Sequence, residues 1–228
     1  MKSWLVAISV AAGRLGGFWG VGAYLGAALF VSAAALLEKR LAPEGAVDAT
    51  LTGAVFGWTI PLLAYAAVAR VSRYGRLDDG TADLVRHGGD RRAIVASFVL
   101  MTAARVSVVG ALLAALGVLV SSVGEASAIR SDALTSAWIG ALGGAAYVAW
   151  FSLGSLWGKA GRGRLLSLVL DWVLGATSTA VAVPWPRAHL QCLLGGELVA
   201  GLPAWQSSVL LGLFAGLYYL ASLLRVAR

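Results

Sequence analysis

Long apolar runs separated by short charged segments dominate the pattern of this chain. A helix of about 20 apolar residues crosses about 30 Å of hydrocarbon, and six runs reach that length. The runs cover residues 15–37, 49–69, 93–123, 133–158, 165–183 and 204–224. The pattern predicts one all-α, polytopic membrane domain over residues 1–228, with six transmembrane helices and both termini on the same side of the membrane.

The first fourteen residues form a separate, shorter apolar stretch. Lys2 and Arg14 lie at its two ends, and Trp4 lies near its start. A basic start followed by a short apolar stretch is also typical of a signal peptide. We expect residues 1–14 to form a helix that lies along the membrane interface, because its ends are charged and its tryptophan suits the headgroup region.

Composition excludes a soluble domain. The mean hydropathy is +0.81 and only 13% of residues are charged, whereas soluble domains carry roughly a quarter. In a soluble protein the net charge of +7 would suggest nucleic-acid binding. In a membrane protein the same Lys and Arg residues set the orientation, so we do not expect nucleic acid as a partner. The single cysteine, Cys192, cannot form a disulfide within the chain.

The positive charges alternate from one interhelical segment to the next. Of the 18 Lys and Arg residues, Arg105 lies inside a predicted span, and Lys39, Arg40, Arg130 and Arg187 lie in alternate segments. All the others lie at the termini or in the segments 70–92 and 159–164. Positive residues concentrate on the cytoplasmic side, so we expect both termini and these two segments to be cytoplasmic.

The segment between the second and third runs contains the sequence ADLVRHGGDRRAI, with signals for a short helix. Asp83 comes early and Arg86 and His87 come late, an order that suits the helix dipole. Gly88 fits a left-handed C-cap, and Asp90 fits the N-cap of the next helix. The sequence predicts a helix of about two turns over Thr81–His87. Such a helix is marginal alone in water, so we expect it to pack on lipid headgroups or on a protein partner.

The segment 184–203, PWPRAHLQCLLGGELVAGLP, connects the last two runs and is unusually rich in Pro and Gly. Two half-helices, at about 187–194 and 197–202, fit between its breaks. They are too short to cross the membrane but apolar enough to dip into it. Arg187, His189 and Glu197 are its candidate functional residues, and a role as interfacial anchors of a tight turn suits them equally.

Arg105 and Asp171 are the candidate charges inside the membrane. Arg105 suits either an interfacial position or pairing with an acid, and Asp171 suits pairing with Arg162, Arg164 or Arg105. A proton relay is the alternative for these residues, although a relay normally needs a longer series of such groups. Metal binding shared by His87 and His189, the two histidines, is excluded because they lie on opposite sides of the predicted topology.

This organisation resembles the membrane subunit, or permease, of ABC transporters of the ABC-2 exporter type. The resemblance covers the interfacial helix, the six spans, the short helix after the second span and the apolar excursion after the fifth. The phrases LVRHGGDRRAI, WGKAGRGRLLSLVLDWVLG and PWPRAHLQCLLGG resemble stretches of bacterial permeases of this kind. The resemblance implies a place in the bacterial inner membrane.

The resemblance also implies a division of labour between chains. The short cytoplasmic helix would be a coupling helix that contacts a separate ATP-binding cassette subunit, through Thr81, Asp83, Leu84, Val85, Arg86, His87 and Gly88. The excursion would form re-entrant half-helices that close the outer end of the pathway. Partners would be that ATPase, a second permease of the same or a related sequence, and lipid.

We expect no enzymatic activity and no cofactor on this chain, because it contains no GxxxxGK[ST] phosphate-binding loop. ATP and magnesium would bind to the partner subunit. A structural subunit of a larger membrane complex and a secondary transporter are the alternatives from other classes.

Overall fold

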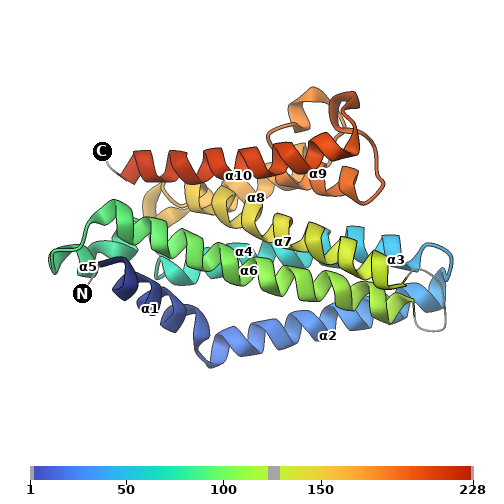
Figure 1. The fold of residues 1–228 in the computed structure, drawn as a ribbon, viewed down its shortest axis with the longest axis horizontal. Helices are drawn as coiled ribbons and strands as arrows, with labels where there is room; N and C mark the ends of the chain where they lie inside the picture. The colour runs from blue at the N-terminus through green and yellow to red at the C-terminus, as the bar shows by residue number, and fades with distance from the viewer. Residues whose placement is uncertain (1–2, 123–128, 227–228) are drawn as a thin grey trace.

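The chain folds into a bundle of roughly parallel and antiparallel helices (Figure 1). The computed structural model describes residues 3–122 and 129–226, and these contain helices and no strands. The α-helices are α1 (Ser3–Gly16), α2 (Phe18–Leu41), α3 (Ala46–Ala49), α4 (Ile60–Val71), α5 (Ala82–Arg86), α6 (Arg91–Ser121), α7 (Ile129–Gly154), α8 (Gly163–Leu174), α9 (Pro186–Leu193) and α10 (Ala204–Val226). A π-helix, η1 (Thr50–Thr59), joins α3 to α4. Short 3-10 turns are η2 (Asp79–Thr81), η3 (Lys159–Gly161), η4 (Ala180–Ala182) and η5 (Val199–Gly201).

Five helical segments in the described part of the chain are long and apolar enough to cross a membrane. They are Gly20–Leu41, Ala46–Val71, Arg91–Ser121, Ile129–Gly154 and Ala204–Val226. They correspond to the first four predicted spans and the sixth, and they confirm a helical protein of the multi-pass membrane type. The first span begins later than predicted because the chain breaks at Gly17, so that Leu15 belongs to α1 and is buried.

The predicted fifth span, residues 165–183, is not one continuous helix. Its helical part, α8, has 12 residues and ends at Leu174. At 1.5 Å per residue, α8 is about 18 Å long, well short of a bilayer core. The residues that follow, Gly-Ala-Thr-Ser-Thr, favour turns over helix. Since α7 and α10 both run toward the end that holds the two termini, residues 155–203 return the chain to the opposite end by a broken path (Figure 1).

The centre of the bundle is the contact between α6 and α7, which depends on small residues. A Cβ atom at Gly110 would lie 2.6 Å from the Gly140 carbonyl oxygen, and one at Gly144 would lie 2.8 Å from that of Val106. Close backbone approach of this kind is how helices gain packing energy inside a bilayer. Substitution at Gly110 or Gly144 would therefore push these two helices apart.

The outermost helices are α2 and α10. Only 17% of the spanning part of each is buried, compared with 72% for α7. Their exposed side chains are apolar, as shown by Leu29 (72% exposed) and Trp205 (66%). A lipid environment favours apolar side chains on the outer faces of a helix bundle, as α2 and α10 have.

Proline is accommodated in the second spanning segment by a change of helix type. Pro61 lacks a backbone N–H, and the ten residues of η1 before it form a π-helix, in which Ile60 N–H bonds to Val55 O. The Thr59 hydroxyl also donates to Ala54 O at 2.6 Å. Pro61 thus stands in the first turn of α4, where a missing backbone N–H is tolerated.

Candidate functional site: two short helices at opposite ends of the bundle

Helix α5 lies at the end of the bundle where both termini lie (Figure 1). Its caps are those expected from the sequence. Gly88 is left-handed, with φ +83°, and Gly89 N–H bonds to Leu84 O at 3.2 Å. The Asp90 carboxylate accepts a 2.8 Å hydrogen bond from Ala93 N–H and caps α6. The helix is slightly shorter than predicted, because Thr81 belongs to the preceding 3-10 turn and His87 is the C-cap residue.

The inner side of α5 is anchored by this chain itself. Leu84 and Val85 are half-buried and pack against the main hydrophobic core. Arg14 of α1 donates to Gly80 O at 2.9 Å and to Val71 O at 2.6 Å, and so joins the segment before α5 to α1 and α4. Thr81 is buried and donates to Asp78 O at 2.7 Å. The chain's own core contacts therefore hold one side of this helix, and the expected contact with lipid or a partner stays a prediction for its other side.

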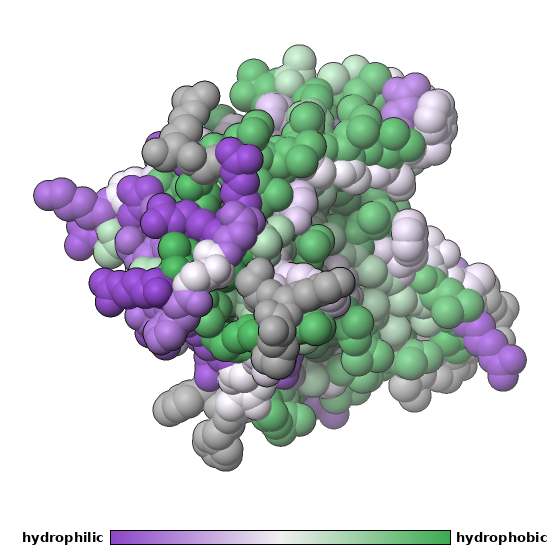
Figure 2. All heavy atoms as spheres, turned by 60° about the vertical axis from the view of Figure 1, so that its left-hand side comes forward, coloured by the Kyte–Doolittle hydropathy of each residue, from purple (hydrophilic) through white to green (hydrophobic). Residues whose placement is uncertain are grey.

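The outer side of α5 carries charge. Asp83, Arg86, His87 and Gly88 are exposed. Asp83 forms an ion pair with Arg73 at 2.7 Å, and its carbonyl oxygen lies 2.7 Å from His87 Nδ1. Hydrophilic side chains gather at this end of the molecule, bordered by hydrophobic flanks (Figure 2). Four of the predicted coupling residues thus lie on the exposed side, and Arg86 and His87 form no ion pair among the described residues, whereas Leu84 and Val85 face inward.

Arg105 lies on α6 beside α1 and α2. Its guanidinium sits 5.3 Å from the centre of the Tyr24 ring, a cation–π distance. Its Nη1 would lie 3.6 Å from a Cβ at Gly16, next to the break between α1 and α2. Within the described residues it forms no ion pair with an acid, so its contact is aromatic rather than the acid pairing that was one of its two expected roles.

Asp171 is fully buried on α8 and has two hydrogen-bond donors. The Tyr147 hydroxyl of α7 donates to one carboxylate oxygen at 2.9 Å, and the Arg187 backbone N–H of α9 donates to the other at 3.1 Å. The carboxylate therefore joins three helices at one point. Charge-assisted hydrogen bonds of this kind satisfy a buried carboxylate without a neighbouring cation in direct contact.

The predicted ion pair of Asp171 with Arg162, Arg164 or Arg105 is wrong. Arg162 is exposed, whereas Arg164 is buried and donates to Ser72 Oγ at 2.6 Å and Gly75 O at 3.1 Å. Asp171 is seven residues further along the same helix face, about 10 Å away at 1.5 Å per residue. Arg164 therefore binds the end of α4, while Asp171 binds α7 and α9.

At the opposite end of the bundle, the first predicted half-helix corresponds to α9, Pro186–Leu193. The second forms only the three-residue turn η5. His189 is 1% exposed, with Nε2 2.7 Å from Val183 O and its ring stacked on Phe214 at 6.1 Å. Glu197 is exposed, and Arg187 is half-buried above Asp171. The structure therefore does not bring these three predicted residues together at one surface.

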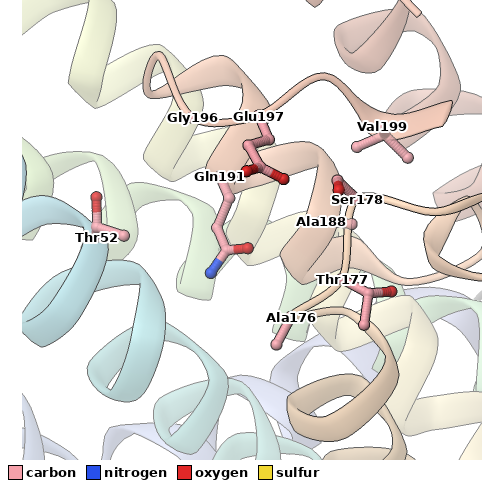
Figure 3. Close-up of a pocket in the computed structure, with 9 residues that line it drawn as sticks. All are labelled: Thr52, Ala176, Thr177, Ser178, Ala188, Gln191, Gly196, Glu197 and Val199. Carbon is pink, nitrogen blue, oxygen red and sulfur yellow. The ribbon is translucent and has the colours of Figure 1, made fainter. Parts of the chain in front are cut away.

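A pocket of about 190 Å³ with several polar side chains in its lining lies beside α9 (Figure 3). It is lined by Thr52, Ala176, Thr177, Ser178, Ala188, Gln191, Gly196, Glu197 and Val199. Glu197 is the one residue among these that the sequence singled out. Thr52 and Gln191 could not be found from sequence, because they are far apart in the chain and meet only through the packing of η1 against α9. The lining offers hydroxyls, an amide and one carboxylate, a set suited to hydrogen bonding with a polar ligand.

The described part of the chain contains no group of three or more His, Cys, Asp or Glu side chains that could hold a metal ion. In comparisons with known proteins, no family model, no curated sequence and no solved structure matches the chain. The functional interpretation therefore depends on the arrangement of the helices and on the two short helices at the ends.

Proposed function

We propose that this chain is the permease subunit of an ATP-driven exporter, and that a separate ATPase docks on the exposed face of α5. The observation that supports this most strongly is the construction of α5. It sits between the second and third long helices, it is anchored by its own chain on one side, and it presents Arg86 and His87 on the other. A surface helix that is rigidly attached and charged outward is suited to receiving force from a partner.

The contacts around α5 would carry that force into the bundle. Arg14 joins the start of the α5 segment to α1 and α4, and the Arg73–Asp83 ion pair joins α5 to the end of α4. Gly89 and Asp90 lead directly into α6. A displacement of α5 would therefore move α1, α4 and α6 together. Movement of packed elements as rigid bodies is a common route of conformational coupling.

In this proposal the broken path from α8 to α9 is the fifth of six crossings and forms the outer gate. The chain returns to the far end without a continuous helix, and irregular backbone at membrane depth is tolerated only where protein or a water-filled cavity shields it. The pocket containing Gln191 and Glu197 opens beside this path (Figure 3). Cargo would leave past it, with two permease copies forming the pathway between them and ATP and magnesium bound to the partner ATPases.

The orientation follows from the same proposal. The end that carries α5 and both termini would be cytoplasmic, in the inner membrane of a bacterium, as the distribution of arginines indicates. A secondary transporter would instead favour several charged groups buried in series. In the described part of the chain, Arg164 and Asp171 are the buried Lys, Arg, Asp or Glu side chains, and they have separate partners. A structural subunit would show no response to ATP.

Site-specific photo-cross-linking tests the proposal. A photoreactive amino acid at His87, in the full chain in its own cell membrane, is expected to capture a polypeptide that contains a GxxxxGK[ST] loop. The matched control is Glu44, which is exposed at the opposite end of the bundle. Capture of that polypeptide from position 87 and not from position 44 would support docking on α5. Adducts to lipid alone, or equal capture from both positions, would contradict it.

A further inference from the structure

Three arginines converge on a second surface near α5, separate from the proposed ATPase contact at Arg86 and His87. A pocket of about 490 Å³ is lined by Arg14, Arg70, Arg73 and Tyr74, which we call the arginine pocket. Arg14 comes from the last turn of α1, Arg70 from the last turn of α4, and Arg73 and Tyr74 from the chain just after α4. Residues from two separate helices thus meet at one point.

The arginine pocket contains more positively charged side chains than acidic side chains to pair with them. Arg73 is paired with Asp83, and Arg14 donates to two carbonyl oxygens, which carry no net charge. The Arg70 guanidinium has no hydrogen bond or ion pair with any described residue, and its Nη2 would lie 3.4 Å from a Cβ at Gly17. The pKa of Arg14 is lowered by burial and then by the neighbouring charge of Arg73, an effect that Asp83 opposes. An anion would relieve this excess.

The backbone of the pocket is also unusual. Arg73 and Tyr74 are both left-handed, with φ values of 53° and 60°. They end α4 in a C-cap, with Arg73 N–H bonded to Arg70 O at 2.9 Å and Tyr74 N–H to Ala69 O at 2.6 Å. Glycine normally takes the left-handed position of such a cap, because other residues are strained there. Strain of this kind is commonly kept where the side chain has a function.

The surroundings of the arginine pocket indicate that it lies at the depth of the lipid headgroups. Trp4 and Leu5 of α1 are 44% and 45% exposed, and α1 packs its other face, through Ala7 and Ala11, on the core. Hydrophilic side chains at this end of the molecule border hydrophobic ones (Figure 2). Guanidinium groups bind phosphate oxygens in pairs, and basic pockets between helices at a membrane surface bind anionic headgroups.

From these observations we propose that the arginine pocket binds the phosphate of an anionic phospholipid headgroup. The proposal is independent of the transport function. Free phosphate shares the same chemistry, but the position beside exposed apolar side chains favours a lipid, whose acyl chains would lie along α1 and α2.

Native mass spectrometry of the full chain tests this site. The chain is purified with a mixture of phosphatidylglycerol and phosphatidylcholine, and the lipid retained per protein is counted. Wild type is expected to retain phosphatidylglycerol in preference, and Arg70→Gln to reduce that retention about fivefold or more. Arg130→Gln, an exposed arginine at the opposite end, is the matched control and is expected to behave as wild type.

A second variant separates binding from folding. Arg73→Gly removes the guanidinium but relieves the left-handed backbone, so we expect lipid retention to fall while the unfolding temperature stays the same or rises. Inorganic phosphate in excess should not displace the lipid. Equal retention by wild type, Arg70→Gln and Arg73→Gly would overturn the proposal. Displacement by phosphate, or binding of phosphate without any lipid preference, would overturn the lipid assignment in favour of a soluble anion.

Discussion

Helices α5 and α9 are both short, both lie at an end of the bundle, and both are bounded by Gly or Pro, yet they differ in what they bury. In α5 the apolar residues Leu84 and Val85 face inward and the charged residues face out. In α9 a polar side chain also faces inward: His189 is buried together with Ala188, Leu190 and Cys192, and the Arg187 backbone N–H binds Asp171. The contrast shows that a polar side chain on a short helix does not by itself indicate a surface for a partner.

The difference has a physical cause in what each helix packs against. Helix α5 packs on α6 and on the turn η2, where a small apolar contact and good caps are enough to hold five residues. Helix α9 covers the gap that the broken path after α8 leaves, where unpaired backbone and side-chain groups need partners. A buried polar group is costly unless it is hydrogen-bonded, and Asp171 is satisfied from within the protein. His189 is satisfied at Nε2, by Val183 O, while its buried Nδ1 has no partner among the described residues.

The largest expected effect comes from removing the buried carboxylate beside α9. Asp171→Ala leaves the Tyr147 hydroxyl and the Arg187 N–H without their acceptor, so we expect the free energy of unfolding to fall by about 2 to 3 kcal/mol. Unfolding of the purified chain in detergent measures this. Glu44→Ala, at an exposed acid, should change it by no more than about 0.5 kcal/mol. Equal effects of the two variants would show that Asp171 is not a structural anchor.

The next effect distinguishes the two sides of α5. Leu84→Asp places a charge against the core, and we expect it to lower the free energy of unfolding by about 2 kcal/mol. Arg86→Asp, two residues away on the exposed side, should leave stability within about 0.5 kcal/mol of wild type. The same unfolding assay compares them. If Arg86→Asp destabilised as much as Leu84→Asp, the assignment of inner and outer sides would be incorrect.

Tyr147→Phe tests the buried contacts beneath α9 more finely, because it removes one hydroxyl and no bulk. The loss of one hydrogen bond to Asp171 should cost about 1 kcal/mol. In a double-mutant cycle, Tyr147→Phe should lower the free energy of unfolding very little when Asp171→Ala is already present, because the two side chains share one interaction. Fully additive effects would mean that the 2.9 Å contact contributes nothing to stability.

The smallest effect concerns the cap of α5. Gly88 has φ +83°, so Gly88→Ala should lower the free energy of unfolding by about 1 kcal/mol through backbone strain. Gly22 provides the matched control, since it lies in α2 and a Cβ atom added there would have no neighbour within 4 Å. There alanine should be neutral or stabilising, because it favours the helix. A Gly88→Ala protein as stable as the Gly22→Ala protein would contradict the left-handed cap.

Sequence reasoning succeeded where the signal is local. The apolar runs locate five long helices, and Gly88 and Asp90 locate the caps around α5, because hydropathy and capping depend on neighbouring residues. It failed for residues 165–183, because hydropathy measures how apolar a segment is and not whether its helix continues. After Leu174, Gly175 and Ala176 are followed by Thr and Ser residues that favour a turn, and packing against α9 completes the break.

Partners of buried groups could not be predicted for a different reason. Tyr147 lies 24 residues from Asp171 in sequence, and Arg187 offers its backbone N–H rather than its charge. Pairing opposite charges by proximity in sequence therefore pointed to Arg164, which binds Ser72, 92 residues away. The inward direction of His189 likewise depends on how α9 packs on Phe214.

The central claim is that the outer side of α5 receives an ATPase, and ATP hydrolysis by the purified assembly tests it most directly. The chain is isolated in mild detergent from its own membranes, and vanadate-sensitive hydrolysis is measured for wild type and for Arg86→Glu combined with His87→Glu. We predict that wild type carries hydrolysis and an ATP-binding polypeptide, and that the variant loses both by about tenfold or more while its unfolding temperature is unchanged. Hydrolysis and co-purification that are absent from wild type, or equal in the variant, would contradict it.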